Sequence, residues 1–153
     1  MKTRLILAAA LAAGAVTAVP LAASADHDDR ITIGARLDFT SQTHADGTFA
    51  VCCSITDAGS ASADITSYQP RGSRANFTAT NRFVGANGTF VIALEGATGP
   101  LGSPVHVAQA RWRVISGTGA YEHLRAHGRL SAVTNQQTGA LTAIDVGEIA
   151  GGS

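Results

Sequence analysis

The sequence predicts a mainly β protein, built as a single antiparallel β-barrel of about eight strands with at most one short helix. Three observations predict this fold. Apolar and polar side chains alternate with a period of two along much of the chain, as in strands with one buried face. Turn signals rich in Gly, Asn and Asp separate these segments at short intervals. Closure of the sheet would leave no exposed edge strand, which favours a barrel over an open sheet.

The N-terminus has the features of a secretory signal peptide. Lys2 and Arg4 precede an apolar, alanine-rich run from Leu5 to Ala18, which is short for a membrane-spanning helix. The Ala-Ser-Ala motif that ends at Ala25 fits the small-residue rule for cleavage. We therefore expect cleavage after Ala25 and secretion of the mature protein.

Cleavage would leave one β-barrel domain, residues 26–153, with no membrane anchor. A chain of this length buries about two thirds of its unfolded surface when it folds, so it needs no disulfide or metal for stability. The full chain has 11 basic and 11 acidic residues, and the leader contains only basic ones. Because no basic patch or polybasic run is present, we expect neither a nucleic acid nor a membrane as partner.

The alternating segments define the expected strands. These are residues 31–39, 49–55, 64–69, 76–84, 89–95, 106–115, 128–133 and 141–149. Asp46-Gly47 and Ala86-Asn87-Gly88 predict turns between strands. Residues 57–63 and 96–104 have the composition of loops, and residues 120–125 predict one helical turn.

The segment from Trp112 to Gly128 is the most informative part of the chain. It resembles the pattern W-x-V-x-x-G-T-G-x-Y-x-x-L-R-G-x-G of secreted bacterial barrels related to allene oxide cyclase and to plant dirigent proteins. The residues that match are Trp112, Val114, Gly117, Gly119, Tyr121, Leu124, Arg125 and Gly128. Residues 88–92 are similar to the strand before the long loop in that family. Ala126 stands where the pattern has Gly, and it would be strained if that position needs a positive φ.

The resemblance implies a barrel that binds an apolar small molecule in its interior, and it assigns no catalytic residue to a position in this chain. The residues themselves predict a structural role for the motif. Gly117 and Gly119 let the chain reverse sharply at the rim of the barrel. Tyr121 and Leu124 are three residues apart, so one helical turn would direct both toward the barrel end as a plug.

Five residues are candidates for lining a ligand site. Ala108, Ala110 and Trp112 share one face of the strand at 106–115, and the two alanines leave room beside the indole. Tyr121 and Glu95 complete the set. No cofactor is implied by the sequence.

Four acidic residues, Asp38, Glu95, Asp145 and Glu148, could supply an acid or a base. A carboxylate that faces a barrel interior would have a raised pKa and would mark a site. Buried acids are rare, so we expect these side chains on the outer surface near arginines.

Cys52 and Cys53 are adjacent. Their Cα atoms would lie ~3.8 Å apart across a trans peptide, below the usual disulfide range that begins at ~4.4 Å, and a strand directs neighbouring side chains to opposite faces. We expect two unbridged thiols, one inside and one outside. An intermolecular bridge ranks second, and a vicinal redox ring ranks last.

His123 and His127 would share one face of a helix, but two histidines need a third ligand to hold zinc, and the H-E-x-x-H order is absent. We therefore expect no metal. Three functions stay open: binding of a small apolar ligand, an isomerase or cyclase of the allene oxide cyclase type, and an extracellular protein-interaction module that works as an oligomer. We expect binding rather than catalysis.

Overall fold

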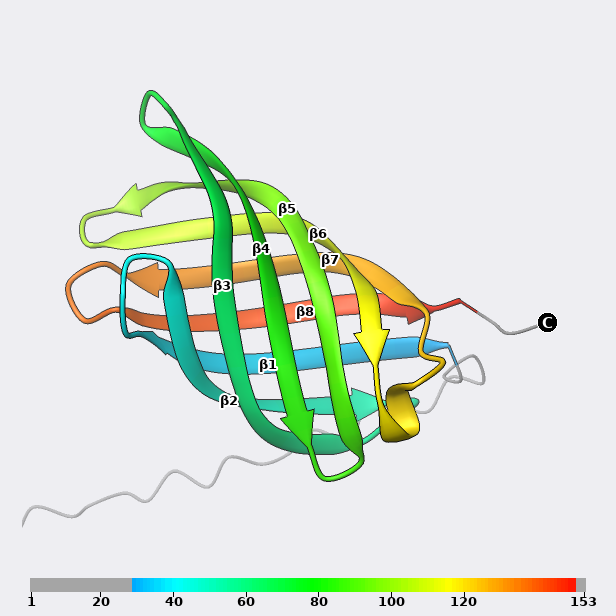
Figure 1. Cartoon of the computed structure of the whole chain (residues 1–153). Helices are drawn as coiled ribbons and strands as arrows, with labels where there is room; N and C mark the ends of the chain where they lie inside the picture. The colour runs from blue at the N-terminus through cyan, green and yellow to red at the C-terminus, as the bar shows by residue number, and fades with distance from the viewer. Residues whose placement is uncertain (1–28, 151–153) are drawn as a thin grey trace, which may run out of the picture.

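The computed structural model describes residues 29–150, which form a closed barrel of eight antiparallel strands (Figure 1). The strands are β1 (Arg30–Phe39), β2 (His44–Cys53), β3 (Asp57–Arg71), β4 (Arg74–Gly85), β5 (Gly88–Gly102), β6 (Val105–Gly117), β7 (Ala126–Asn135) and β8 (Ala140–Ile149). One 3-10 turn, η1 (Gly119–Tyr121), lies between β6 and β7. The predicted fold class is confirmed, whereas the predicted signal peptide lies outside the described residues.

Each strand pairs with the next one in the chain, and β1 pairs with β8 to close the barrel. The connections therefore alternate between two ends. The hairpin end carries residues 40–43, 72–73, 103–104 and 136–139, on the left and top left of Figure 1. The η1 end carries the other connections, including η1 itself. No helix between residues 29 and 150 has the length and apolar character needed to span a membrane.

Aromatic side chains fill the interior at the η1 end. The rings of Phe83 and Phe90 stack with centroids 4.7 Å apart, and Phe49 packs edge-on against both. The ring of Tyr121 lies 4.7 Å from that of Phe90. All four side chains are buried, so they supply much of the apolar area and the favourable ring contacts of the core.

Several strands are longer than the sequence pattern predicts. Asp46-Gly47 does not form a turn but lies inside β2, opposite Asp38 and Leu37. A Cβ atom at Gly47 would stand 1.9 Å from the carbonyl oxygen of Arg36, so glycine is needed here for close strand approach. Residues 57–63 and 96–102, predicted as loops, belong to β3 and β5.

The glycine-rich motif behaves as predicted. Gly119 has a φ of +61°, and a Cβ atom at Gly117 would lie 1.9 Å from the carbonyl oxygen of Tyr121. Both positions therefore need glycine for the chain to turn from β6 into η1. Within residues 29–150, Cys53 is the one non-glycine residue with a positive φ, so Ala126 is unstrained and its side chain is buried in the core.

Candidate ligand site in the barrel interior

The hairpin end of the barrel encloses a cavity of about 600 Å³. Small side chains at several inward-facing positions leave this space open. Five alanines line it: Ala63, Ala79, Ala108, Ala132 and Ala143. The alanines come from β3, β4, β6, β7 and β8, and the cavity is also bordered by Phe39, Tyr68 and Phe77. The buried rings of Phe49, Phe83, Phe90 and Tyr121 fill the η1 end. The barrel is thus closed at one end and hollow at the other.

The cavity wall is mainly apolar and its rim is polar. Leucine and isoleucine side chains, including Leu37, Leu94 and Ile65, complete the wall between the alanines. Loop residues 41–43 and Gln136 lie at the rim. Asn81 is the most buried polar residue of the lining, because it is only 5% exposed and contributes an amide to the interior. Such a lining solvates an apolar molecule and offers a few polar groups to orient it.

The predicted lining residues lie in four different places. Ala108 lines the cavity. Ala110 and Trp112 face inward on the same strand but lie closer to the η1 end. Tyr121 belongs to the cluster of four buried rings at that end, which we call the aromatic plug. Glu95 is exposed on the outer surface of β5 and therefore does not line the interior. The structure therefore brings Ala108, but not Glu95, to the cavity.

The indole ring of Trp112 packs against glycines of β7 and β8. Trp112 pairs with Gly128, which pairs with Gly147. A Cβ atom at Gly147 would lie 2.4 Å from Cζ2 of the indole, so the ring rests directly on the backbone of β8. The indole Nε1 is buried and has no hydrogen-bond acceptor.

The expectation that all four acidic residues lie on the outer surface was wrong for Asp145. Asp38, Glu95 and Glu148 are exposed as expected, but Asp145 faces inward and is 0% exposed. Neither carboxyl oxygen has a hydrogen-bond partner. Burial raises the pKa of Asp145 to about 7.

Asp145 lies next to the cavity rather than on its wall. It pairs directly with Leu130 on β7 and is two residues from Ala143 on β8, and both of these residues line the cavity. The alternation in β8 had placed Asp145 on the face of Leu141 and Ala143, so the pattern did contain the signal for an interior carboxyl group.

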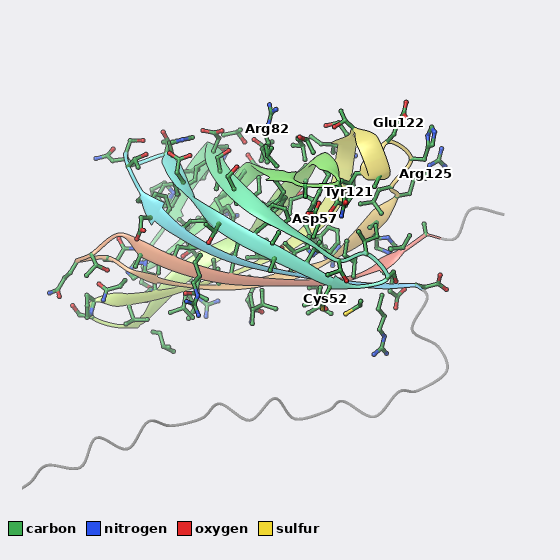
Figure 2. All side chains as sticks on the ribbon, turned by 90° about the horizontal axis from the view of Figure 1, so that it is seen from below. Cys52, Asp57, Arg82, Tyr121, Glu122 and Arg125 are labelled. Atoms are coloured by element: carbon green, nitrogen blue, oxygen red, sulfur yellow. The ribbon has the colours of Figure 1, made fainter. Side chains whose placement is uncertain are left out.

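A buried hydrogen-bonded pair, not predicted from the sequence, fixes the η1 end. The hydroxyl group of Tyr121 donates to Oδ2 of Asp57 at 2.8 Å (Figure 2). The backbone N–H groups of Ala58, Ala86 and Asn87 also donate to this carboxylate. Asp57 thereby joins the start of β3, the β4–β5 turn and η1, and we call this set the Asp57 latch.

The latch shifts the pKa values of both side chains. Burial alone would raise the pKa of Asp57, but the Tyr121 hydroxyl and the three N–H donors stabilise the carboxylate and hold that pKa below its usual value. Burial raises the pKa of Tyr121, and the neighbouring Asp57 carboxylate raises it further. The latch is therefore an ionised acceptor with a neutral phenol, which is a strong hydrogen-bonding arrangement.

Cys52 and Cys53 are both exposed, so the expectation of one thiol inside was wrong. Cys53 has a φ of +93°, which breaks the alternation at the last residue of β2. The two Sγ atoms lie 2.8 Å apart, and the label in Figure 2 marks Cys52 on the outer surface of the barrel. The hydrogen bond to Cys53 raises the pKa of the Cys52 thiol.

A helix on which His123 and His127 would share one face is not formed. η1 ends at Tyr121, and His127 belongs to β7. Both histidines are exposed. In residues 29–150, no group of three His, Cys, Asp or Glu side chains is arranged to hold a metal ion.

The outer wall also carries a shallow groove of about 660 Å³ across β3 to β7. Glu95, Arg111 and Arg129 follow one another across paired strands within it. This polar surface is the location of Glu95. It is distinct from the apolar interior cavity, although Phe77 and Leu130 border both.

No family model, curated protein or solved structure matches the chain.

Proposed function

We propose that this protein is a secreted β-barrel that binds a small apolar ligand in the cavity at its hairpin end. The observation that carries the proposal is a cavity of about 600 Å³ with mainly apolar walls and a polar rim. Ligand pockets are typically ~300–1,000 Å³ and have this distribution of polarity. The alanines that line the cavity keep it hollow in a core that is otherwise closely packed.

Two further observations support a binding role. The resemblance of Trp112 to Gly128 to barrels of the allene oxide cyclase and dirigent type implies an interior apolar site. The Asp57 latch and the aromatic plug close the opposite end, so a ligand would enter between the hairpins. The main support for an interaction module is a pair of apolar side chains on β8, Ile144 and Val146, each just over half exposed. The interior cavity favours ligand binding over that function.

Filling the cavity will remove ligand binding. In Ala108→Phe, a phenyl ring would occupy the space beside Ala132, with which Ala108 pairs on β7. We expect an apolar fluorescent probe of the anilinonaphthalene type to bind the wild-type protein and to bind this variant at least about tenfold more weakly, which corresponds to ~1.4 kcal/mol. Probe titration by fluorescence measures both affinities.

The matched control is Ala97→Phe, because Ala97 is exposed on the outer face of the adjacent strand. This variant adds the same ring without entering the barrel, so its affinity should equal that of the wild type. Equal weakening in both variants, or no probe binding to the wild-type protein across a library of apolar compounds, would refute the proposal.

An isomerase or cyclase of the allene oxide cyclase type is a second candidate, and Asp145 is the observation that favours it. Such a reaction needs an interior acid or base, and burial raises the pKa of Asp145 to about 7, close to neutral pH. Its neighbours Leu130 and Ala143 line the cavity, so a bound substrate would lie close to this carboxyl group.

This candidate is tested with Asp145→Asn. If Asp145 is the acid or base, the variant should cyclise an allene oxide substrate at least about 100-fold more slowly than the wild type while it binds the apolar probe equally well. Turnover that survives the substitution would exclude Asp145 from that role. If the wild-type protein binds the probe but shows no turnover, only the binding function is supported.

A further inference from the structure

We propose that Cys52 and Cys53 form a thiol–disulfide exchange site that closes into a vicinal disulfide on the outer wall of the barrel. The two Sγ atoms lie 2.8 Å apart and are in direct contact. This site is independent of the interior cavity and of the ligand proposed for it.

The backbone at Cys53 is what brings the sulfur atoms together. Ile31, which pairs with Cys53, is fully buried, so strict alternation would direct the Cys53 side chain into the barrel as well. The φ of +93° turns it outward to the side on which Cys52 lies. A positive φ at a non-glycine residue is energetically unfavourable, and such conformations cluster at functional sites.

Both thiols are accessible to a reagent in solution. Cys52 and Cys53 are exposed, and they stand at the end of β2 where the chain leaves the sheet. Cys52 pairs with Thr32, whose side chain lies on the outer face. The residues that follow, 54–56, connect β2 to β3, and Ser54 donates hydrogen bonds from its backbone N–H and its hydroxyl group to the carbonyl oxygen of Arg30.

The reaction partner is a low-molecular-mass disulfide, RSSR. One cysteine thiolate attacks a sulfur atom of RSSR, an S–S bond breaks, and RS⁻ leaves and takes up a proton to give RSH. The neighbouring thiolate then attacks the protein sulfur of the mixed disulfide and releases a second RSH. The protein loses two electrons and two thiol protons, and RSSR gains both.

The short distance between the sulfur atoms decides the outcome. Because the second thiol is already in contact with the first, ring closure is an intramolecular step and should outpace the arrival of another external thiol or another protein molecule. The mixed disulfide should therefore be transient, and neither a stable adduct nor a dimer should accumulate.

The test is exposure of the reduced full chain to excess glutathione disulfide, followed by maleimide labelling and intact-mass measurement. The wild-type protein is expected to lose about 2 Da, to take up no maleimide, and to remain a monomer on a non-reducing gel. Fragmentation should place the bond between Cys52 and Cys53. Added thiol should restore two labelled cysteines.

Cys52→Ser and Cys53→Ser are the matched controls. Each retains one exposed thiol with no neighbour, so each should hold one glutathione as a stable mixed disulfide. Wild-type protein that keeps one or two glutathione molecules, that becomes a disulfide-linked dimer, or that retains two free thiols under these conditions would overturn the proposal. If both variants unfold at the same temperature as the wild-type protein, their glutathione adducts form on a folded barrel.

Discussion

Replacing Asp145 by asparagine will remove most of the pH dependence of stability between about pH 4 and pH 7. In the unfolded chain this carboxyl group has the ordinary aspartate pKa of 3.8, and burial raises the pKa to about 7 in the barrel. The folded state thus binds this proton more tightly than the unfolded state does. The contribution of Asp145 to the free energy of unfolding is therefore largest below about pH 4, and it falls by about 4 kcal/mol as the pH rises to 7.

Urea unfolding measured at intervals from pH 4 to pH 8.5 checks this prediction. The asparagine variant should give a flatter curve and should be the more stable protein at the alkaline end. Asp145→Leu, which also removes the unpaired polar atoms, should give the same flat profile. Glu148→Gln is the control, because Glu148 is exposed on the same strand and its loss should leave the wild-type slope in place. Parallel curves for wild type and Asp145→Asn would contradict the burial of this side chain.

Breaking the Asp57 latch is expected to be the most destabilising polar substitution in the barrel. Tyr121→Phe removes one hydrogen bond to a carboxylate and should lower the free energy of unfolding by about 1.5–3 kcal/mol. Asp57→Ala removes the acceptor of the phenol and of three backbone N–H groups, so the loss should be larger, about 3–5 kcal/mol. Urea unfolding at pH 7 measures both values.

The double variant distinguishes a latch from two independent effects. Because Tyr121 and Asp57 share one hydrogen bond, the combined loss should be smaller than the sum of the single losses. Glu122→Ala, an exposed change next to Tyr121, should leave stability unchanged. The pKa of Asp57 is lowered in the folded state, so the stabilisation is present above about pH 4 and is lost on further acidification. Additive losses would mean that the two side chains do not act together.

The strand interiors and the closed barrel could be predicted from the sequence, because alternation and turn chemistry are local properties. The missed segments have a physical reason. Residues 57–63 are rich in Gly, Ser and Ala, so they carry little hydrophobic contrast, although Ala61 is buried in β3. Gly47 signals a turn in composition, but it serves a close approach between β1 and β2 that only the folded sheet reveals.

The candidate site was less predictable. Ala108 was identified because its face of β6 could be read from alternation. Asp145 was placed outside because acids are usually exposed, although its own strand pattern directed it inward. Tyr121 was expected to plug the barrel, but its partner Asp57 is 64 residues away in the chain, and spacing alone cannot reveal such a pair. The positive φ of Cys53 leaves no mark in the sequence.

The closing pair of β1 and β8 has a consequence for how the polypeptide could be rewired. Arg30 pairs with Glu148, so the first and last strands begin and end side by side. Every other pairing joins strands that are neighbours in the chain. If a linker joined β8 to β1, any one of the existing connections could be cut without separating the strands that it links from the rest of the chain. A circularly permuted chain that is opened at the exposed tip near Gly72 would contain the same strand pairings, with its new ends between β3 and β4.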